Sequence, residues 1–134
     1  MVNYCLDSNV LIDFLRDNEN VIRHMEEARE AGNLLSICPI VYYEIVRDFK
    51  IANASNKLKK FLDLYQSLSH LPFNMQVAEK AADIYEQTHK QVIEDNDIYI
   101  AAISIVNDCT LVTANTRHFS RVEGLDFVNW RDYD

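Results

Sequence analysis

Glycine and proline are scarce in this sequence, with two of each among 134 residues. A chain so poor in both is neither loop-rich nor of low complexity. No apolar run approaches the roughly 18 residues that a membrane span needs, and the N-terminus lacks the basic region and long apolar core of a secretory signal. The hydrophobic fraction of 49% with 25% charged residues is typical of soluble globular proteins. We therefore expect a soluble, cytoplasmic protein with a single domain over residues 1–134.

Cysteine and positive charge are also in short supply. Cys5, Cys38 and Cys109 share no close spacing, and each lies in or beside an apolar run, so we interpret them as small buried hydrophobes rather than zinc ligands or disulfide partners. Thirteen basic against 21 acidic residues give a net charge of −8, whereas a general nucleic-acid binder has a basic footprint. The acidity is either diffuse solubilising surface or partly concentrated in a cation site.

Short apolar segments alternate with helical patterns along the chain. The pattern predicts strands at 2–6, 34–38, 70–73, 109–113 and around 127–128, and helices at 10–16, 19–31, from 39 to before 53, 57–69, 75–91 and 98–106. In helix 75–91 the residues expected to face inward are Val77, Ala78, Ala81, Ala82 and Tyr85. The alternation, without any hairpin signal, predicts an α/β fold: a three-layer α/β/α sandwich around a short-stranded parallel sheet. In such sheets the working site lies beyond the carboxyl ends of the strands.

The end of the first strand carries an acidic residue. Asp7-Ser8-Asn9 follows apolar residues 2–6, and these three short polar residues suit a turn or a helix cap. A charge at the end of a buried strand is costly and is usually paired or bound to a metal. Asn115 lies just past the strand expected at 109–113, at the same edge of the sheet.

Three carboxylates stand against apolar surroundings: Asp7, Glu44 within a helix, and Asp97 at a helix start. Together in one cleft they would repel one another strongly unless a cation lay between them. Oxygen ligands suit Mg²⁺ or Mn²⁺, and one or two such ions can generate a hydroxide nucleophile and stabilise the charge of phosphodiester cleavage.

Plainer interpretations exist for several charged residues. Glu44 can pair with Arg47 or Lys50 on its own helix surface, an interaction that is common and weak. Asp97 can be the N-cap of its helix, a role compatible with metal binding because one carboxylate oxygen stays available. Asp13 is interpreted as a helix-surface charge near Arg16, able to reach the rim of the site.

Four segments in this order resemble a known family: Leu6-Asp-Ser-Asn9, Glu44 in the helix after Pro39, Asp97-Ile-Tyr-Ile-Ala-Ala102, and Leu111-Val-Thr-Ala-Asn-Thr-Arg-His-Phe119. Over nearly its whole length the chain resembles the PIN-domain ribonucleases, and most closely the VapC toxins of bacterial and archaeal toxin–antitoxin pairs. The resemblance implies a PIN-like fold and an acidic metal site. Asp7 and Asp97 would be direct ligands of Mg²⁺, with Mn²⁺ as a possible substitute. Glu44 would hold a metal water or a second ion.

The resemblance also assigns the remaining site residues. Ser8 and Asn9 would fix the loop around Asp7, and Asn115 would orient a metal water or the substrate, so that Asn115 joins the three acids as a catalytic residue. It implies a Mg²⁺-dependent endoribonuclease that acts on RNA (tRNA or another structured RNA), forms a homodimer and is inhibited by a VapB-like antitoxin. The alternatives are a housekeeping PIN nuclease for RNA processing without an antitoxin, and a catalytically silent binding module of the same fold.

Two features depart from that pattern or leave it open. Many relatives carry an acidic residue in the Asn-Thr-Arg-x-Phe segment where this chain has His118, so the fourth carboxylate is missing. His118 would contact phosphate or be an exposed turn residue, and we favour the latter. The basic residues in the middle of the chain form either a solvated helix face or an edge that guides RNA; they are Arg47, Lys50, Lys57, Lys59 and Lys60.

Overall fold

The computed structural model describes residues 1–132. In this range one five-stranded sheet has the order β3-β2-β1-β4-β5, and all of its neighbouring strands are parallel. The strands are β1 (Asn3–Leu6), β2 (Leu34–Ile37), β3 (Ser69–His70), β4 (Cys109–Val112) and β5 (Phe127–Val128). The expected α/β fold with short parallel strands is confirmed. The single-domain expectation over residues 1–134 extends to Tyr133 and Asp134, which lie outside the described residues.

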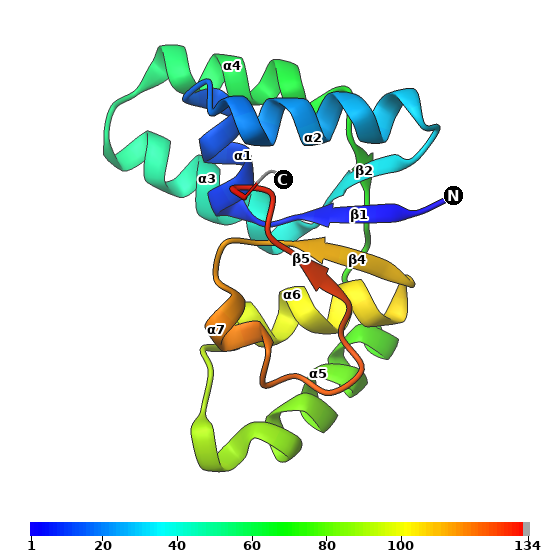
Figure 1. Ribbon diagram of the computed structural model, residues 1–134. Coiled ribbons are helices and arrows are strands. Elements are labelled where there is room, and N and C mark those ends of the chain that lie inside the picture. The colour runs from blue at the N-terminus through cyan, green and yellow to red at the C-terminus, as the bar shows by residue number, and fades with distance from the viewer. Residues whose placement is uncertain (133–134) are drawn as a thin grey trace.

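Helices cover both faces of the sheet and complete three layers. The helices are α1 (Ser8–Leu15), α2 (Glu19–Glu30), α3 (Pro39–Ile51), α4 (Ser55–Tyr65), α5 (Met75–Thr88), α6 (Asp95–Val106) and α7 (Thr116–Phe119), with a 3₁₀ turn η1 (His89–Gln91). Figure 1 shows α1, α2 and α4 over one face of the sheet, α5 and α6 over the other, and α3 near the carboxyl ends of the strands. Among residues 1–132, no helix has the length and apolar character to cross a bilayer.

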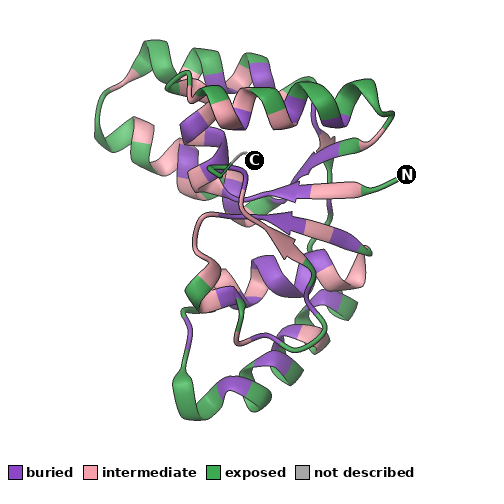
Figure 2. Ribbon diagram, in the orientation of Figure 1, coloured by how far each residue is buried: buried purple, intermediate pink, exposed green. Residues whose placement is uncertain are grey.

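The core is densest where the central strands meet α6. Cys5 and Leu6 of β1 and Leu111 and Val112 of β4 are fully buried, and residues 100–103 of α6 are buried on every side. Figure 2 shows this burial along the strands and the inner helix faces. The three cysteines are buried and free, as expected of small hydrophobes. Burial raises the pKa of the Cys109 thiol to about 11, which keeps it protonated and unreactive.

Two helices begin earlier than the sequence predicts, which changes where acidic residues lie relative to the helix start. Helix α1 begins at Ser8 rather than Val10, because the Asp7 carboxylate accepts a hydrogen bond from the Ser8 amide and caps the helix. Helix α6 begins at Asp95, with Glu94 in extended conformation before it. Asp97 is therefore not the N-cap; it lies within the first turn, where a negative charge complements the helix dipole.

The buried face of α5 was only partly predicted. Val77 and Ala81 are buried as expected, together with Ile84, but Ala78, Ala82 and Tyr85 are exposed. The buried positions 77, 81, 84 and 88 form one stripe that packs on α6. Alanine pairs fit either side of such a stripe because burying a methyl group gains little free energy.

Candidate active site

The register of β1 and β4 brings two polar residues together at the strand ends. Leu6 pairs with Val112, and the Asp7 amide continues the ladder by donating to the Val112 carbonyl at 3.0 Å. Thr113 therefore follows directly beside Asp7. Its buried hydroxyl donates to Asp7 Oδ2 at 2.8 Å.

The rest of the loop after β1 holds the Asp7 carboxylate from its other sides. The Ser8 amide donates to Oδ1 at 2.8 Å, and Asn9 Nδ2 donates to Oδ2 at 3.2 Å. Asn9 Oδ1 also accepts from the Ala114 amide at 3.0 Å, which ties this loop to the one after β4. Only 4% of Asp7 is exposed. Ser8 and Asn9 thus both hydrogen-bond to the Asp7 carboxylate, Ser8 through its backbone amide and Asn9 through its side chain.

Glu44 faces a neighbouring helix rather than the surface of its own. Its Oε2 accepts a hydrogen bond from Asn96 Nδ2 of α6 at 3.3 Å. The nearby Arg47 pairs instead with Asp48, at 2.9 Å from Nε to Oδ1. The surface pair considered as the plain explanation for Glu44 is therefore not formed, and Glu44 is directed toward the start of α6.

Asp97 meets two residues of the segment after β4. Its Oδ2 lies 3.5 Å from Asn115 Nδ2 and 3.3 Å from His118 Nδ1, and these two nitrogens are 2.9 Å apart. Our preference for His118 as an exposed turn residue is wrong, because the short helix α7 turns its ring back onto Asp97. Asn115 lies in this group, and its role in orienting a metal water or the substrate stays a prediction.

The three carboxylates affect one another electrostatically. Burial raises the pKa of Asp7 above its ordinary value, and the charge of Asp97 adds to this, while hydrogen bonds from Thr113, Ser8 and Asn9 oppose it. Burial likewise raises the pKa of Glu44, with further contributions from Asp7 and Asp97. The pKa of Asp97 is also raised by burial, against the hydrogen bond and charge of His118.

This donor set fits a hard divalent cation. The charge of Asp97 helps raise the pKa of Asp7, and the charges of Asp7 and Asp97 help raise that of Glu44; a cation among them would remove this repulsion. Within residues 1–132, no three histidine, cysteine or acidic side chains form a cluster tight enough to enclose a metal ion by themselves. The arrangement suits an ion that keeps several waters and takes one or two carboxylates, as Mg²⁺ commonly does.

Asp13 is not the surface charge that the sequence suggested. Its side chain is buried, and it accepts two hydrogen bonds from Arg131, from Nε at 2.6 Å and from Nη2 at 3.2 Å. The expectation of a helix-surface charge near Arg16 is wrong, because Asp13 is buried and its carboxylate binds Arg131, 118 positions away in the chain. Asp13 is thereby occupied in joining α1 to the C-terminal segment.

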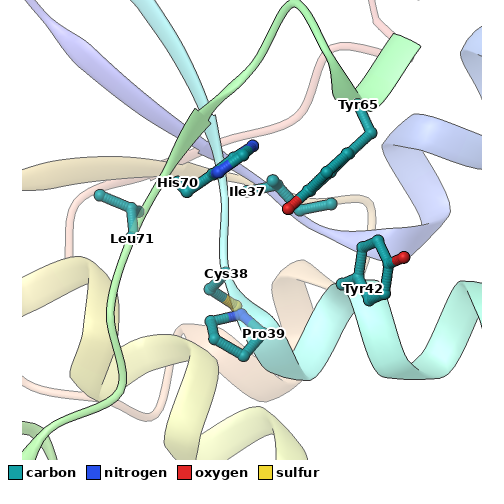
Figure 3. A pocket seen from close by; sticks show the side chains of 7 residues that line it. All are labelled: Ile37, Cys38, Pro39, Tyr42, Tyr65, His70 and Leu71. Atoms are coloured by element: carbon teal, nitrogen blue, oxygen red, sulfur yellow. The ribbon is translucent and has the colours of Figure 1, made fainter. Parts of the chain in front are cut away.

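An apolar pocket of about 190 Å³ lies beside the ends of β2 and β3, between α3 and α4. Its aromatic walls include Tyr42, Tyr65 and His70, and the last two rings are stacked with centroids 4.4 Å apart. Figure 3 shows that no carboxylate lines it. The pocket is therefore separate from the acidic site, and its stacked ring gives His70 a packing role.

The basic residues in the middle of the chain do not act as one group. Arg47 lies over the Tyr43 ring, 5.2 Å from its centroid, and pairs with Asp48. Lys57 and Lys60 line a groove of about 440 Å³ between α1, α3 and α4. The edge that guides RNA stays a prediction.

Two supporting residues, Thr113 and Asn96, were not selected from the sequence, and the orientation of His118 toward Asp97 was not predicted. Thr113 carries a usable signal, because it is the residue next to Asp7 once the two strands are aligned at their ends. Asn96 offers none, since an Asn in an acidic turn is an ordinary helix-start residue.

The fold, with its acidic residue at the end of β1, is that of a known class of protein. The chain belongs to the PIN domain family, because the sequence model of that family matches residues 4–125.

Individual members of the family are similar to this chain over most of its length. The chain is 24% identical over 130 residues to Ribonuclease VapC2 of Rickettsia felis, covering 95% of this chain and 97% of that protein. Ribonuclease VapC1 of the same organism is 33% identical over 98 residues, 69% of this chain and 73% of that protein. The crystal structure of VapBC2 from Rickettsia felis bound to a promoter DNA fragment contains a similar chain, with a TM-score of 0.87 and 22% identity over 96% of this chain and 99% of that one.

Proposed function

We propose that this protein is a metal-dependent endoribonuclease and the toxin of a VapC-type toxin–antitoxin pair. The observation that carries the proposal is that the charges of Asp7 and Asp97 help raise the pKa of Glu44, which hydrogen-bonds to Asn96 beside Asp97, in a chain of the PIN family. The names of its curated relatives, which are VapC ribonucleases, support the same activity.

In this proposal each site residue has a distinct task. Asp7 and Asp97 would hold Mg²⁺, or Mn²⁺ in its place, and Glu44 would hold a water of its shell or a second ion. When bound, such an ion supplies an activated water and neutralises charge on the phosphodiester. Asn115 would orient that water or a phosphate oxygen.

The loop residues would keep the Asp7 carboxylate ready for the ion. Hydrogen bonds from Ser8, Asn9 and Thr113 fix its two oxygens at one orientation. Because these donors are neutral, they orient the carboxylate without cancelling its charge. A cation site needs a charged oxygen that is already fixed in position before the metal ion binds.

The proposal extends to substrate and partners. The substrate would be RNA, such as tRNA or another structured RNA, in the cytoplasm. A VapB-like antitoxin is the expected partner, because the solved structures that share this fold include complexes of VapBC pairs. A homodimer built from this PIN domain completes the proposal.

The direct test is cleavage of RNA with Mg²⁺ or Mn²⁺ by the wild type, Asp7→Ala and Asp97→Ala. Asp63→Ala is a matched control, because Asp63 is an exposed acid on α4. The proposal predicts that both site variants lose cleavage and that the control cleaves RNA at the wild-type rate. Cleavage at the wild-type rate by either site variant would show that the site is assigned wrongly.

The antitoxin pair can be tested in cells. Expression of the wild type should arrest growth, Asp7→Ala should not, and co-expression of a cognate VapB-like antitoxin should restore growth. Cleavage in vitro without growth arrest would instead support the housekeeping nuclease.

A further inference from the structure

Each of the three site carboxylates accepts a hydrogen bond from the side-chain amide of an asparagine. The nitrogen-to-oxygen distances are 3.2, 3.3 and 3.5 Å for Asn9 with Asp7, Asn96 with Glu44, and Asn115 with Asp97. An amide donates without bringing a charge, so it orients a carboxylate and does not neutralise it. The proposed function gives a task to two of these asparagines, and Asn96 is the one without.

Glu44 depends on its asparagine more than the other two acids do. It lies on α3, away from the end of β1 where Asp7 lies, and its carboxylate ends a longer side chain. Asp7 is held by three donors, and Asp97 also meets His118. Within residues 1–132, the amide of Asn96 is the one hydrogen-bond donor to the Glu44 carboxylate.

The neighbouring negative charges oppose the placement of Glu44. Burial raises the pKa of Glu44, and the charges of Asp7 and Asp97 raise it further. The hydrogen bond from Asn96 acts in the opposite direction and lowers this pKa. Like charges therefore repel the Glu44 carboxylate from the site, and the amide of Asn96 holds it there.

Asn96 stands where one helical turn can serve two acids. It directly precedes Asp97 in the first turn of α6, and α3 packs against α6. The turn that carries Asp97 therefore also presents an amide donor to Glu44. An ionised carboxylate can only accept hydrogen bonds, so the amide turns its nitrogen rather than its oxygen toward Glu44.

We propose that Asn96 is a positioning residue that holds the Glu44 carboxylate at the acidic site, and that it affects RNA cleavage only through Glu44. This rests on the proposed function, because it takes Asp7, Glu44 and Asp97 to belong to one metal site. Groups that hydrogen-bond to metal-site carboxylates orient them, and losing such a group commonly costs about ten- to a hundredfold in activity or metal affinity.

A double-mutant cycle on RNA cleavage tests whether Asn96 acts through Glu44. Asn96→Ala should lower the single-turnover rate by about ten- to a hundredfold, and Glu44→Ala should lower it at least as much. The double variant should cleave no more slowly than Glu44→Ala alone, because the amide then has no carboxylate to hold. Losses that multiply, or a wild-type rate in Asn96→Ala, would overturn the inference.

The asparagine at the other end of α6 is a matched control. Asn107 Nδ2 donates to the Ile103 carbonyl at 2.8 Å rather than to a carboxylate. Asn107→Ala should cleave RNA at the wild-type rate, although it also removes a hydrogen bond from α6. A loss of cleavage equal to that of Asn96→Ala would mean that any loosening of this helix lowers the rate, against a specific role for Asn96.

An isosteric variant separates the donor from the shape of the side chain. Asn96→Asp keeps the shape, removes the amide donor and adds a charge that repels Glu44. It should therefore lose at least as much cleavage as Asn96→Ala. Full cleavage by Asn96→Asp would show that the shape alone matters, and the inference would be wrong.

Two measurements do not depend on cleavage. In the metal-free protein, the side-chain amide protons of Asn96 should move upfield in the NMR spectrum of Glu44→Ala, while those of Asn107 stay in place. By calorimetry, Asn96→Ala should weaken Mn²⁺ binding by about tenfold or more when Glu44 is present and leave it unchanged in Glu44→Ala. An unshifted Asn96 amide, no loss of Mn²⁺ binding, or the same loss in both backgrounds would contradict the role.

Failure of this inference is distinguishable from failure of the proposed function. If the wild type binds Mn²⁺ and cleaves RNA, and Asn96→Ala does both equally well, the metal site stands and only the role of Asn96 is wrong. If Asp7→Ala and Asp97→Ala bind Mn²⁺ and cleave RNA as the wild type does, the metal site itself is wrong, and the inference is wrong with it.

Discussion

Helix α1 connects two buried aspartates that the protein treats in opposite ways. Asp7 caps the start of the helix and Asp13 lies near its end, with 4% and 8% of their surfaces exposed. Asp13 is held by the guanidinium of Arg131 through two hydrogen bonds. Asp7 receives hydrogen bonds only from neutral groups within residues 1–132.

The difference shows which carboxylate serves the structure. The hydrogen bond and charge of Asp13 raise the pKa of Arg131, which means that Asp13 stabilises the charged guanidinium. Around Asp7, burial raises the pKa, and neutral donors only partly oppose it. A buried carboxylate that is oriented but not neutralised is suited to an external cation.

The largest expected contrast is in catalysis. Asp7→Asn should lower RNA cleavage by about a thousandfold or more, because it removes a charge worth several kcal/mol to the transition state. Asp13→Asn makes the same chemical replacement at the other end of α1, and it should leave the cleavage rate near that of the wild type. Single-turnover rates on one RNA measure both, and equal losses would erase the distinction between the two aspartates.

The next largest contrast between the two aspartates is in how much a bound metal ion stabilises the protein. Mn²⁺ at a hundred times its dissociation constant should stabilise the wild type by about 2.7 kcal/mol, since it binds only the folded state. Asp13→Asn should gain the same stabilisation from its lower starting point, and Asp7→Asn should gain none. Thermal unfolding with and without Mn²⁺ gives the values; a gain retained by Asp7→Asn would place the ion elsewhere.

The ion pair should matter for stability alone. We expect Asp13→Asn to lower the free energy of unfolding by about 1–2 kcal/mol, less than a fully buried pair would cost, because half of the Arg131 side chain is exposed and screened. Urea denaturation measures the change. Arg131→Gln should match it, and a destabilised Asp7→Asn of the same size would contradict the comparison.

The smallest effect is a pH dependence of the metal-free protein. A raised pKa in the folded state means that folding disfavours the ionised carboxyl, so stability is lost as pH rises through that pKa. Asp7→Asn avoids the ionisation. The variant should therefore be the more stable of the two at pH 7.5, and its advantage should shrink as pH falls toward the ordinary carboxyl range. A stability advantage that does not change with pH would show that ionisation of Asp7 does not destabilise the folded protein.

Much of the site could be foreseen because its signals are local. A strand that runs into Asp7-Ser8-Asn9 predicts both a capped helix and a charge at a sheet edge. Asp97 was found, but its position in the helix was not, since Glu94, Asp95 and Asp97 are all acceptable near a helix start. The direction of Glu44 was left open, because a helical pattern does not say which neighbouring helix will supply Asn96.

The sequence by itself determined the alternation of strands and helices, the parallel sheet and the identity of the acidic residues, since these follow from hydrophobic period, caps and charge placed in apolar surroundings. Only the tertiary structure decided which charges have partners. Arg131 reaches Asp13 across 118 positions, and His118 reaches Asp97 across 21. Such contacts depend on how elements pack in space, and no local period or propensity encodes them.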